Sequence, residues 1–288
     1  ASIGVQDFSS KVQAAINRFQ SFEQTRDVVD GLRRRGVKSI NVDVVYGLPH
    51  QTREMLRGTV DQVIELKPDR VALFGYAHVP WMKKHQTMID ETALPNAVER
   101  YAGASRAAAR LSAAGYVRVG IDHFALPADG LAVALGEGRL RRNFQGYTDD
   151  PAQALVGLGA SSISELPQGY VQNITATPVY MKRVLAGELA TARGYELTSE
   201  DRMRRAFIER LMCDFAIDRA AFREAYGDLA TPLLEDAEHL ATADNDGLVE
   251  MEGDLFRVTP RGRAFVRTIA ASFDAYLQEG GARHSVAV

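Results

Sequence analysis

The sequence has almost no cysteine and no long apolar run. Cys213 is the one cysteine in 288 residues, which excludes an internal disulfide framework and is typical of a reducing compartment. A single thiolate also excludes an iron–sulfur cluster held by this chain alone, because such clusters need several cysteine ligands. No apolar run approaches the roughly 18 residues that a transmembrane helix requires. We therefore expect a cytoplasmic protein with no membrane partner.

Basic residues are scarce in the last third of the chain. After Gly194 there are 18 acidic residues, 11 arginines and no lysine, a net charge of −7, whereas the whole chain carries −3. Residues 1–194 therefore carry +4. Nucleic-acid binding requires a basic face, so the acidic last third argues against a nucleic-acid partner. The mildly basic first part is compatible with an anionic substrate.

Strand-like and helix-like segments alternate through residues 1–194. Four apolar segments rich in β-branched residues are separated by helical sequence: residues 2–8, 39–48, 70–78 and 116–124. Strands that alternate with helices predict an α/β unit with a parallel sheet. We expect Thr52 to cap the helix after the second strand, and Pro95 to lie in the first turn of the helix after the third.

Residues 195–288 predict a smaller, mainly helical unit. Thr198 is expected to cap its first helix, and a second helix is expected over residues 228–243. A β-hairpin over residues 247–258 then precedes a last helix opened by Pro260. This order of elements resembles a winged-helix module, but the acidic charge favours a packing or lid role over DNA binding.

One carboxylate lies inside the most apolar strand. Alternation places Asp43 on one face of the strand and Val42 and Val44 on the other. The valines are expected to face helices, so the carboxylate faces a sheet crevice or the inside of a barrel, near the strand ends where α/β proteins bind ligands. Two interpretations remain open: Asp43 pairs with a buried arginine, or it serves a functional site.

A basic, amide-rich loop over residues 139–148 is the second candidate site. Its arginines could bind carboxylates through bidentate forks, or they are simply an exposed charged run. His123, at the end of the fourth strand, is either an anion contact or a structural hydrogen-bonding group. Taken alone, Gln6 is either a satisfied polar cap or a site residue at a strand end, and Arg18 is a solvated charge. These patterns predict a ligand-binding α/β protein with an anion-binding loop.

Five segments carry a family resemblance: residues 2–8 (SIGVQDF), 43–49 (DVVYGLP), 75–80 (GYAHVP), 122–125 (DHFA) and 142–148 (RNFQGYT). Together they resemble the oxygen-independent coproporphyrinogen III oxidases (coproporphyrinogen dehydrogenases), members of the radical S-adenosylmethionine superfamily. The similarity runs over nearly the whole chain, and the RNFQGYT segment is its most specific part.

The resemblance implies the second half of a partial (β/α)6 barrel followed by a mainly helical, winged-helix-like C-terminal domain. It also implies oxidative decarboxylation of two propionates of coproporphyrinogen III to vinyls, giving protoporphyrinogen IX in haem biosynthesis. In the family, a 4Fe–4S cluster and S-adenosylmethionine generate the 5′-deoxyadenosyl radical that starts the reaction. The implied partners are coproporphyrinogen III and an unidentified electron donor and acceptor, and the full-length enzyme is expected to be monomeric.

The resemblance also implies roles for particular residues. Gln6 and Arg18 fall where the family contacts S-adenosylmethionine, with Arg18 at its carboxylate, and Asp43 falls at the ribose hydroxyls. Ala77 and Ile163 match positions that line the adenine. The residues indicated for the tetracarboxylate substrate are His123, Arg142, Asn143, Gln145 and Tyr147.

The chain departs from the family in one respect. The CxxxCxC motif that binds the cluster is absent, so we expect no metal ligand in this chain. We interpret the chain as the C-terminal portion of such an enzyme and expect it to be inactive alone. Its first strand is then expected to have an unpaired edge and to promote self-association. The alternatives are a haem chaperone on the same fold, against which the RNFQGYT segment argues, and a winged-helix regulator.

Overall fold

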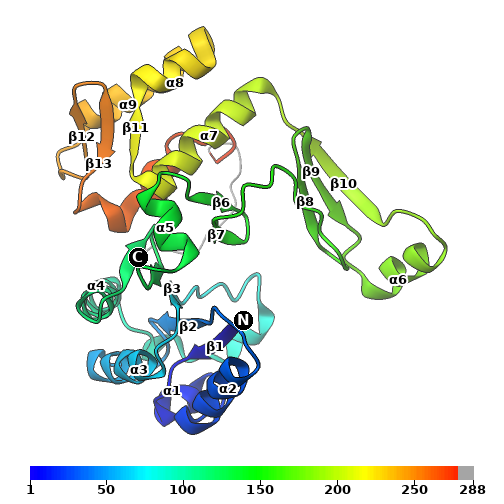
Figure 1. Ribbon diagram of the computed structural model, residues 1–288, viewed down its shortest axis with the longest axis vertical. Coiled ribbons are helices and arrows are strands. Elements are labelled where there is room, and N and C mark those ends of the chain that lie inside the picture. Colours follow the sequence, from blue (N-terminus) through cyan, green and yellow to red (C-terminus); the bar gives the residue numbers. More distant parts are fainter. Residues whose placement is uncertain (278–288) are drawn as a thin grey trace.

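A five-stranded sheet organises the first part of the protein (Figure 1). The computed structural model describes residues 1–277. In their order across the sheet, the strands are β1 (Ser2–Gln6), β2 (Asn41–Tyr46), β3 (Arg70–Gly75), β5 (His123–Ala125) and β4 (Val117–Val119). β1, β2 and β3 are parallel, whereas β5 is antiparallel to both β3 and β4. β1 forms one edge of this sheet.

Helices pack on one face of the sheet, and we call the opposite face, which carries Asp43, the open face. The helices of this part are α1 (Ser10–Ala15), α2 (Phe22–Arg34), α3 (Arg53–Leu66) and α4 (Ala97–Ala113). Val42 and Val44 are fully buried and belong to the same core cluster as Leu56 of α3 and Leu111 of α4. The alternation predicted for β2 is therefore confirmed, because Asp43 points to the open face and is only partly buried.

The prediction of a fourth parallel strand over residues 116–124 is wrong. This segment forms two short antiparallel strands, β4 and β5, and β5 runs antiparallel to β3. The turn between them passes through Gly120, whose φ is +59°. A Cβ atom at this position would collide with the ring of Tyr147. Both the backbone conformation and the close packing therefore require glycine.

The start of α4 also differs from the prediction, while the cap of α3 agrees with it. Pro95 precedes the helix, and Asn96 is the N-cap. The Asn96 side chain accepts from Glu99 N and the Glu99 side chain accepts from Asn96 N, both at 3.0 Å, which forms a capping box. Thr52 caps α3 as predicted, with Oγ1 accepting from Met55 N at 3.3 Å. Two 3-10 turns, η1 (Lys84–Met88) and η2 (Glu91–Ala93), lie between β3 and α4.

A hairpin and a long arm follow the sheet. α5 (Gly130–Gly136) leads into the hairpin of β6 (Arg141–Asn143) and β7 (Gly146–Thr148). The arm is a separate antiparallel sheet of β8 (Ile163–Leu166), β9 (Gly169–Asn173) and β10 (Thr191–Glu196), with α6 (Thr177–Leu185) between β9 and β10. Figure 1 shows this arm projecting to the side of the five-stranded sheet.

The remaining described residues form a C-terminal module with its own core. Its elements are α7 (Ser199–Asp214), β11 (Ala216–Asp218), α8 (Arg219–Tyr226), η3 (Gly227–Ala230), α9 (Thr231–Ala243), β12 (Val249–Glu252), β13 (Leu255–Val258), η4 (Gly262–Phe265) and α10 (Val266–Ala271). The Thr198 cap is confirmed, because its Oγ1 accepts from Asp201 N at 3.1 Å. The predicted 228–243 helix begins as η3, and Pro260 precedes a 3-10 turn instead of opening a continuous helix.

The division of the chain into units of residues 1–194 and 195–288 remains a prediction. The proposed boundary falls inside β10. Cys213 of α7 belongs to a core cluster with Leu140 and Tyr147, so the two parts share buried contacts. Within residues 1–277, no helix combines the length and apolar character needed to cross a membrane.

Candidate active site

The open face of the sheet carries a group of polar side chains around Gly4. Gly4 and Asp43 are partners in the parallel register of β1 and β2, so the carboxylate lies beside Gly4 on this face. A Cβ atom on residue 4 would lie 2.6 Å from Gln6 Nε2 and 3.4 Å from Arg18 Nη2. The missing Cβ of Gly4 therefore lets the side-chain ends of Gln6 and Arg18 lie close to the β1 backbone. We call Gln6, Arg18 and Asp43 the Gly4 cluster.

The backbone of β1 holds two members of this cluster. Gln6 has a φ of +67°, and the register shifts between Gly4 and Gln6, so the side chain of Gln6 bends back over Gly4. Positive φ is uncommon for residues other than glycine and is concentrated at functional sites. Arg18 follows α1, and its Nη2 donates to the Gly4 carbonyl at 2.7 Å. Among residues 1–277, Arg18 forms no ion pair with a carboxylate.

Asp43 has one carboxylate oxygen engaged and one free for a ligand. Asn41 Nδ2 donates to Asp43 Oδ1 at 2.7 Å and to Ser2 Oγ at 2.8 Å. Within the described residues, Asp43 Oδ2 makes no hydrogen bond and no arginine pairs with the carboxylate. The structure therefore gives no support to the buried-arginine interpretation. A free, acceptor-only oxygen on an open face suits a ligand hydroxyl.

The two residues matched to the adenine position lie on different parts of the protein. Ala77 follows β3 and is exposed, and its carbonyl accepts from Gln86 Nε2 at 3.0 Å. It thus lies at the strand end where ligands bind in parallel sheets. Ile163 begins β8 in the separate sheet of the arm, with its carbonyl against Gly157. Ile163 is therefore not on the sheet that carries Gln6 and Asp43.

His123 connects the open face to the C-terminal module. It pairs with Ala72 in β3, and its ring contacts Phe74 at 5.8 Å and Tyr147 at 5.4 Å, both edge to face. His123 Nδ1 lies 2.7 Å from Asp122 Oδ1, and Arg267 Nη2 of α10 lies 2.8 Å from Asp122 Oδ2.

The ionised form of Asp122 is favoured. Burial alone would raise its pKa, but the hydrogen bond to His123 and the nearby guanidinium groups outweigh burial and lower the pKa below its ordinary value of 3.8. A His123 ring beside a permanent carboxylate is held in one orientation, which is what a contact to substrate requires.

The other predicted substrate residues occupy the β6–β7 hairpin, in three different environments. Gln145 is exposed at the tip, whereas Asn143 Oδ1 accepts from the main-chain N of Gln145 at 2.8 Å and so shapes the turn. Tyr147 is buried, and its hydroxyl donates to Met212 O at 2.9 Å and accepts from Ile121 N at 3.2 Å. The structure therefore brings His123 and Tyr147 together and leaves Gln145 free for a ligand.

Arg142 has the properties of an anion-binding residue. Its Cζ lies 5.5 Å from the centre of the Tyr147 ring, and its Nε is buried without a hydrogen-bond partner among residues 1–277. Its main-chain N donates to Glu209 of α7 at 3.0 Å. The C-terminal module therefore fixes the strand from which this guanidinium projects.

Two residues of this region were not predicted from the sequence. Phe74 is 37% exposed on the open face, two positions after Ala72, so extending the alternation argument to β3 would have found it. Arg267 lies 145 residues from Asp122 in the chain. Only the packing of the C-terminal module brings these two charges together.

The described residues do not supply a site for an iron–sulfur cluster. Cys213 is fully buried, and burial raises the pKa of its thiol to about 12. Within residues 1–277, no three side chains of histidine, cysteine, aspartate or glutamate are placed to hold a metal ion. These residues fit a nucleoside ligand at the Gly4 cluster but do not fit an iron–sulfur cluster.

Similarity to known proteins covers nearly all of the chain. Residues 197–265 match the family described as the HemN C-terminal domain. An oxygen-independent coproporphyrinogen III oxidase of Cereibacter sphaeroides is 50% identical over 96% of this chain and 61% of its own length. The protein of the same name from Bradyrhizobium diazoefficiens is 50% identical over 100% and 64%. The chain thus spans about three fifths of these relatives.

Two further matches agree with these relatives. The oxygen-independent coproporphyrinogen III oxidase of Thermostichus vulcanus is 39% identical over 98% of this chain and 87% of its own length. The solved structure of coproporphyrinogen III oxidase (HemN) from Escherichia coli, described as a radical SAM enzyme, has a TM-score of 0.89 and 39% identity, covering 96% of this chain and 64% of that one. The predicted partial-barrel fold is therefore confirmed. This chain belongs to the oxygen-independent coproporphyrinogen III oxidase family.

Proposed function

We propose that this chain is part of an enzyme that oxidatively decarboxylates two propionates of coproporphyrinogen III to vinyls, giving protoporphyrinogen IX. The observation that carries this proposal is 50% identity to two enzymes of that name over at least 96% of the chain. The electron donor and acceptor are separate partners of such an enzyme. No observation favours the haem-chaperone or DNA-binding alternatives.

The Gly4 cluster is the proposed site for S-adenosylmethionine. Arg18, which has no carboxylate partner among residues 1–277, binds the methionyl carboxylate, and Asp43 Oδ2 accepts from a ribose hydroxyl. Gln6 contributes an amide group that can both donate and accept. We assign Ala77 and Ile163 to the adenine. Once cleaved by an electron from a 4Fe–4S cluster, whose cysteine ligands this chain does not supply, S-adenosylmethionine would provide the radical that removes hydrogen from the substrate.

The proposed substrate contacts are His123, Arg142 and Gln145. The buried, unpaired Nε of Arg142 makes this residue the strongest candidate for a propionate carboxylate. Asn143 and Tyr147 position the hairpin through the contacts described above. We propose that the 288-residue chain alone is inactive, because its single cysteine cannot hold a cluster.

A chimera tests the proposed function. This chain replaces the matching 276 residues of the Cereibacter sphaeroides enzyme, and product is measured anaerobically with coproporphyrinogen III and S-adenosylmethionine. We expect conversion to protoporphyrinogen IX. Arg142→Met in the chimera should lower substrate decarboxylation more than S-adenosylmethionine cleavage, whereas Arg139→Met, an exposed arginine paired with Glu137, should change neither. A folded chimera that cleaves S-adenosylmethionine without forming product would refute the substrate assignment.

A further inference from the structure

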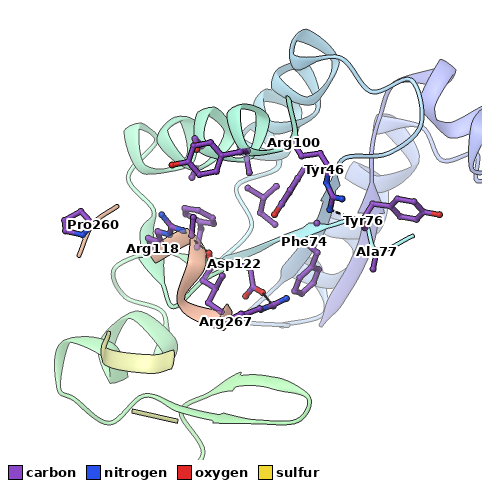
Figure 2. Close-up of a pocket in the computed structure, with 18 residues that line it drawn as sticks. Tyr46, Phe74, Tyr76, Ala77, Arg100, Arg118, Asp122, Pro260 and Arg267 are labelled. Carbon is purple, nitrogen blue, oxygen red and sulfur yellow. Dashed lines mark hydrogen bonds and ion pairs between the residues drawn. The ribbon is translucent and has the colours of Figure 1, made fainter. Parts of the chain in front are cut away.

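A cavity of about 320 Å³ lies between the sheet, α4 and the C-terminal module (Figure 2). Leu73 of β3 and Phe124 of β5 line it from the covered face, α4 forms a second wall, and η4 and α10 of the C-terminal module form the third. Among the residues predicted for the active site, Ala77 alone borders it. The proposed function therefore leaves this space unexplained.

Three arginines from three different elements reach this cavity: Arg100 from α4, Arg118 from β4 and Arg267 from α10. Arg267 is paired with Asp122. Arg100 and Arg118 each donate from Nη2 to a main-chain carbonyl, at 2.8 Å and 3.1 Å, and neither pairs with a carboxylate among residues 1–277. Figure 2 shows Arg118 and Arg267 near Asp122, and Arg100 across the cavity beside Tyr46. Two of the three guanidinium groups thus form no ion pair among residues 1–277.

These two guanidinium groups are also incompletely hydrogen-bonded. The Nε atoms of Arg100 and Arg118 are buried and have no partner among the described residues. A buried donor of a charged group that lacks an acceptor is destabilising, and such groups are rare in folded proteins. Burial and the neighbouring Arg263 lower the pKa of Arg118, and the nearby Asp122 offsets this only in part. An anion in the cavity would accept hydrogen bonds from these guanidinium groups and would favour the charged form of Arg118.

The remaining walls indicate the kind of anion. Guanidinium groups bind carboxylate and phosphate oxygens equally well by geometry, so the arginines alone do not separate these two classes. Leu73, Phe124 and Ala108 add apolar surface between the charged groups, and this surface matches a hydrocarbon or ring body better than a bare inorganic ion. We propose that this cavity binds a small organic carboxylate, with its acid group on Arg118 and Arg100 and its apolar body against the covered face of the sheet.

The position of the cavity couples it to the active site. Arg267 borders the cavity and contacts Asp122, which in turn contacts His123 on the open face. Asp122 also interacts electrostatically with Arg118, so a carboxylate bound to Arg118 competes with Asp122 for the same positive charge. Ligand in this cavity is therefore placed to change how His123 is held.

Isothermal titration of the 288-residue chain with benzoate and, separately, with inorganic phosphate tests the proposal. We expect benzoate to bind with a Kd in the millimolar range or below and more tightly than phosphate. Arg118→Met and Arg100→Met should each weaken benzoate binding about tenfold or more. Arg110→Met removes an arginine of α4 whose partner is the exposed Asp61 and should leave binding unchanged.

A stability measurement separates the proposal from a structural role for Arg118. Arg118→Met loses one hydrogen bond, from Nη2 to Ile121 O, but it also removes a buried Nε that has no partner among residues 1–277. The thermal unfolding midpoint should therefore change little, although binding is removed. Absence of benzoate binding at about 10 mM, an affinity in both arginine variants equal to that of the parent chain, or tighter binding of phosphate than of benzoate would each overturn the proposal.

Discussion

At the scale of single residues, the position of Asp43 follows from strand alternation. Val42 and Val44 are buried against α3 and α4, which leaves Asp43 on the open face. The sequence alone was enough to predict this face, because burial of the two valines allows no other register. The register partner of Asp43 could not be predicted, because it depends on which strand lies next to β2.

Gly4 provides a direct test of the Gly4 cluster. We expect Gly4→Ala to weaken S-adenosylmethionine binding about tenfold or more, because the added Cβ displaces the Gln6 and Arg18 side-chain ends. Since those ends are flexible, the free energy of unfolding should change by less than about 1 kcal/mol. Gly58→Ala, where a Cβ meets nothing within 4 Å, is the matched control. Unchanged binding in Gly4→Ala would exclude the cluster as the site.

The lowered pKa of Asp122 leads to a prediction about how the free energy of unfolding depends on pH. Its pKa is lowered in the folded state, so it contributes stability that is present above the unfolded pKa of about 3.8 and is lost as pH falls through the folded value. Asp122→Asn should therefore lower the free energy of unfolding at pH 7 by roughly 2 kcal/mol. This difference should shrink as the pH falls below 3.8. Urea denaturation across this range measures it, and a difference independent of pH would contradict the account.

At the scale of elements, local signals predicted some boundaries and long-range packing decided others. The caps at Thr52 and Thr198 depend on neighbouring residues alone and were predicted correctly. The β4–β5 turn depends on Gly120, whose packing against Tyr147 involves a residue 27 positions later, as counted from the sequence. Pro95 was misplaced because Asn96 is an equally suitable start signal and forms a capping box with Glu99.

The β6–β7 hairpin is attached to the C-terminal module through Tyr147. Tyr147→Phe removes the hydroxyl, so Met212 O and Ile121 N each lose the hydrogen bond that they make with it. We expect the free energy of unfolding to fall by roughly 1–3 kcal/mol, with S-adenosylmethionine binding unchanged. Urea denaturation and titration calorimetry measure the two effects. Tyr101→Phe, at a partly exposed position, is the control; a loss of binding without a loss of stability would make Tyr147 a ligand contact instead.

At the scale of the whole molecule, β1 is an edge strand of the five-stranded sheet. Unpaired edge strands promote association between chains. We expect the 288-residue chain to self-associate in analytical ultracentrifugation, to a degree that rises with concentration. Ser2→Lys adds a charge at the exposed start of β1 and should reduce association. A monomer at all concentrations would show that this edge is protected.

The measurement that tests the account most directly is calorimetric titration of this chain with S-adenosylmethionine. The account predicts binding to the parent chain and an affinity about tenfold or more lower in Asp43→Asn, because a charge-assisted hydrogen bond to the ribose is lost. Asp27→Asn, at an exposed position of α2, should match the parent. Binding that is the same in the parent, Asp43→Asn and Asp27→Asn, or no binding to the parent at all, would contradict the account.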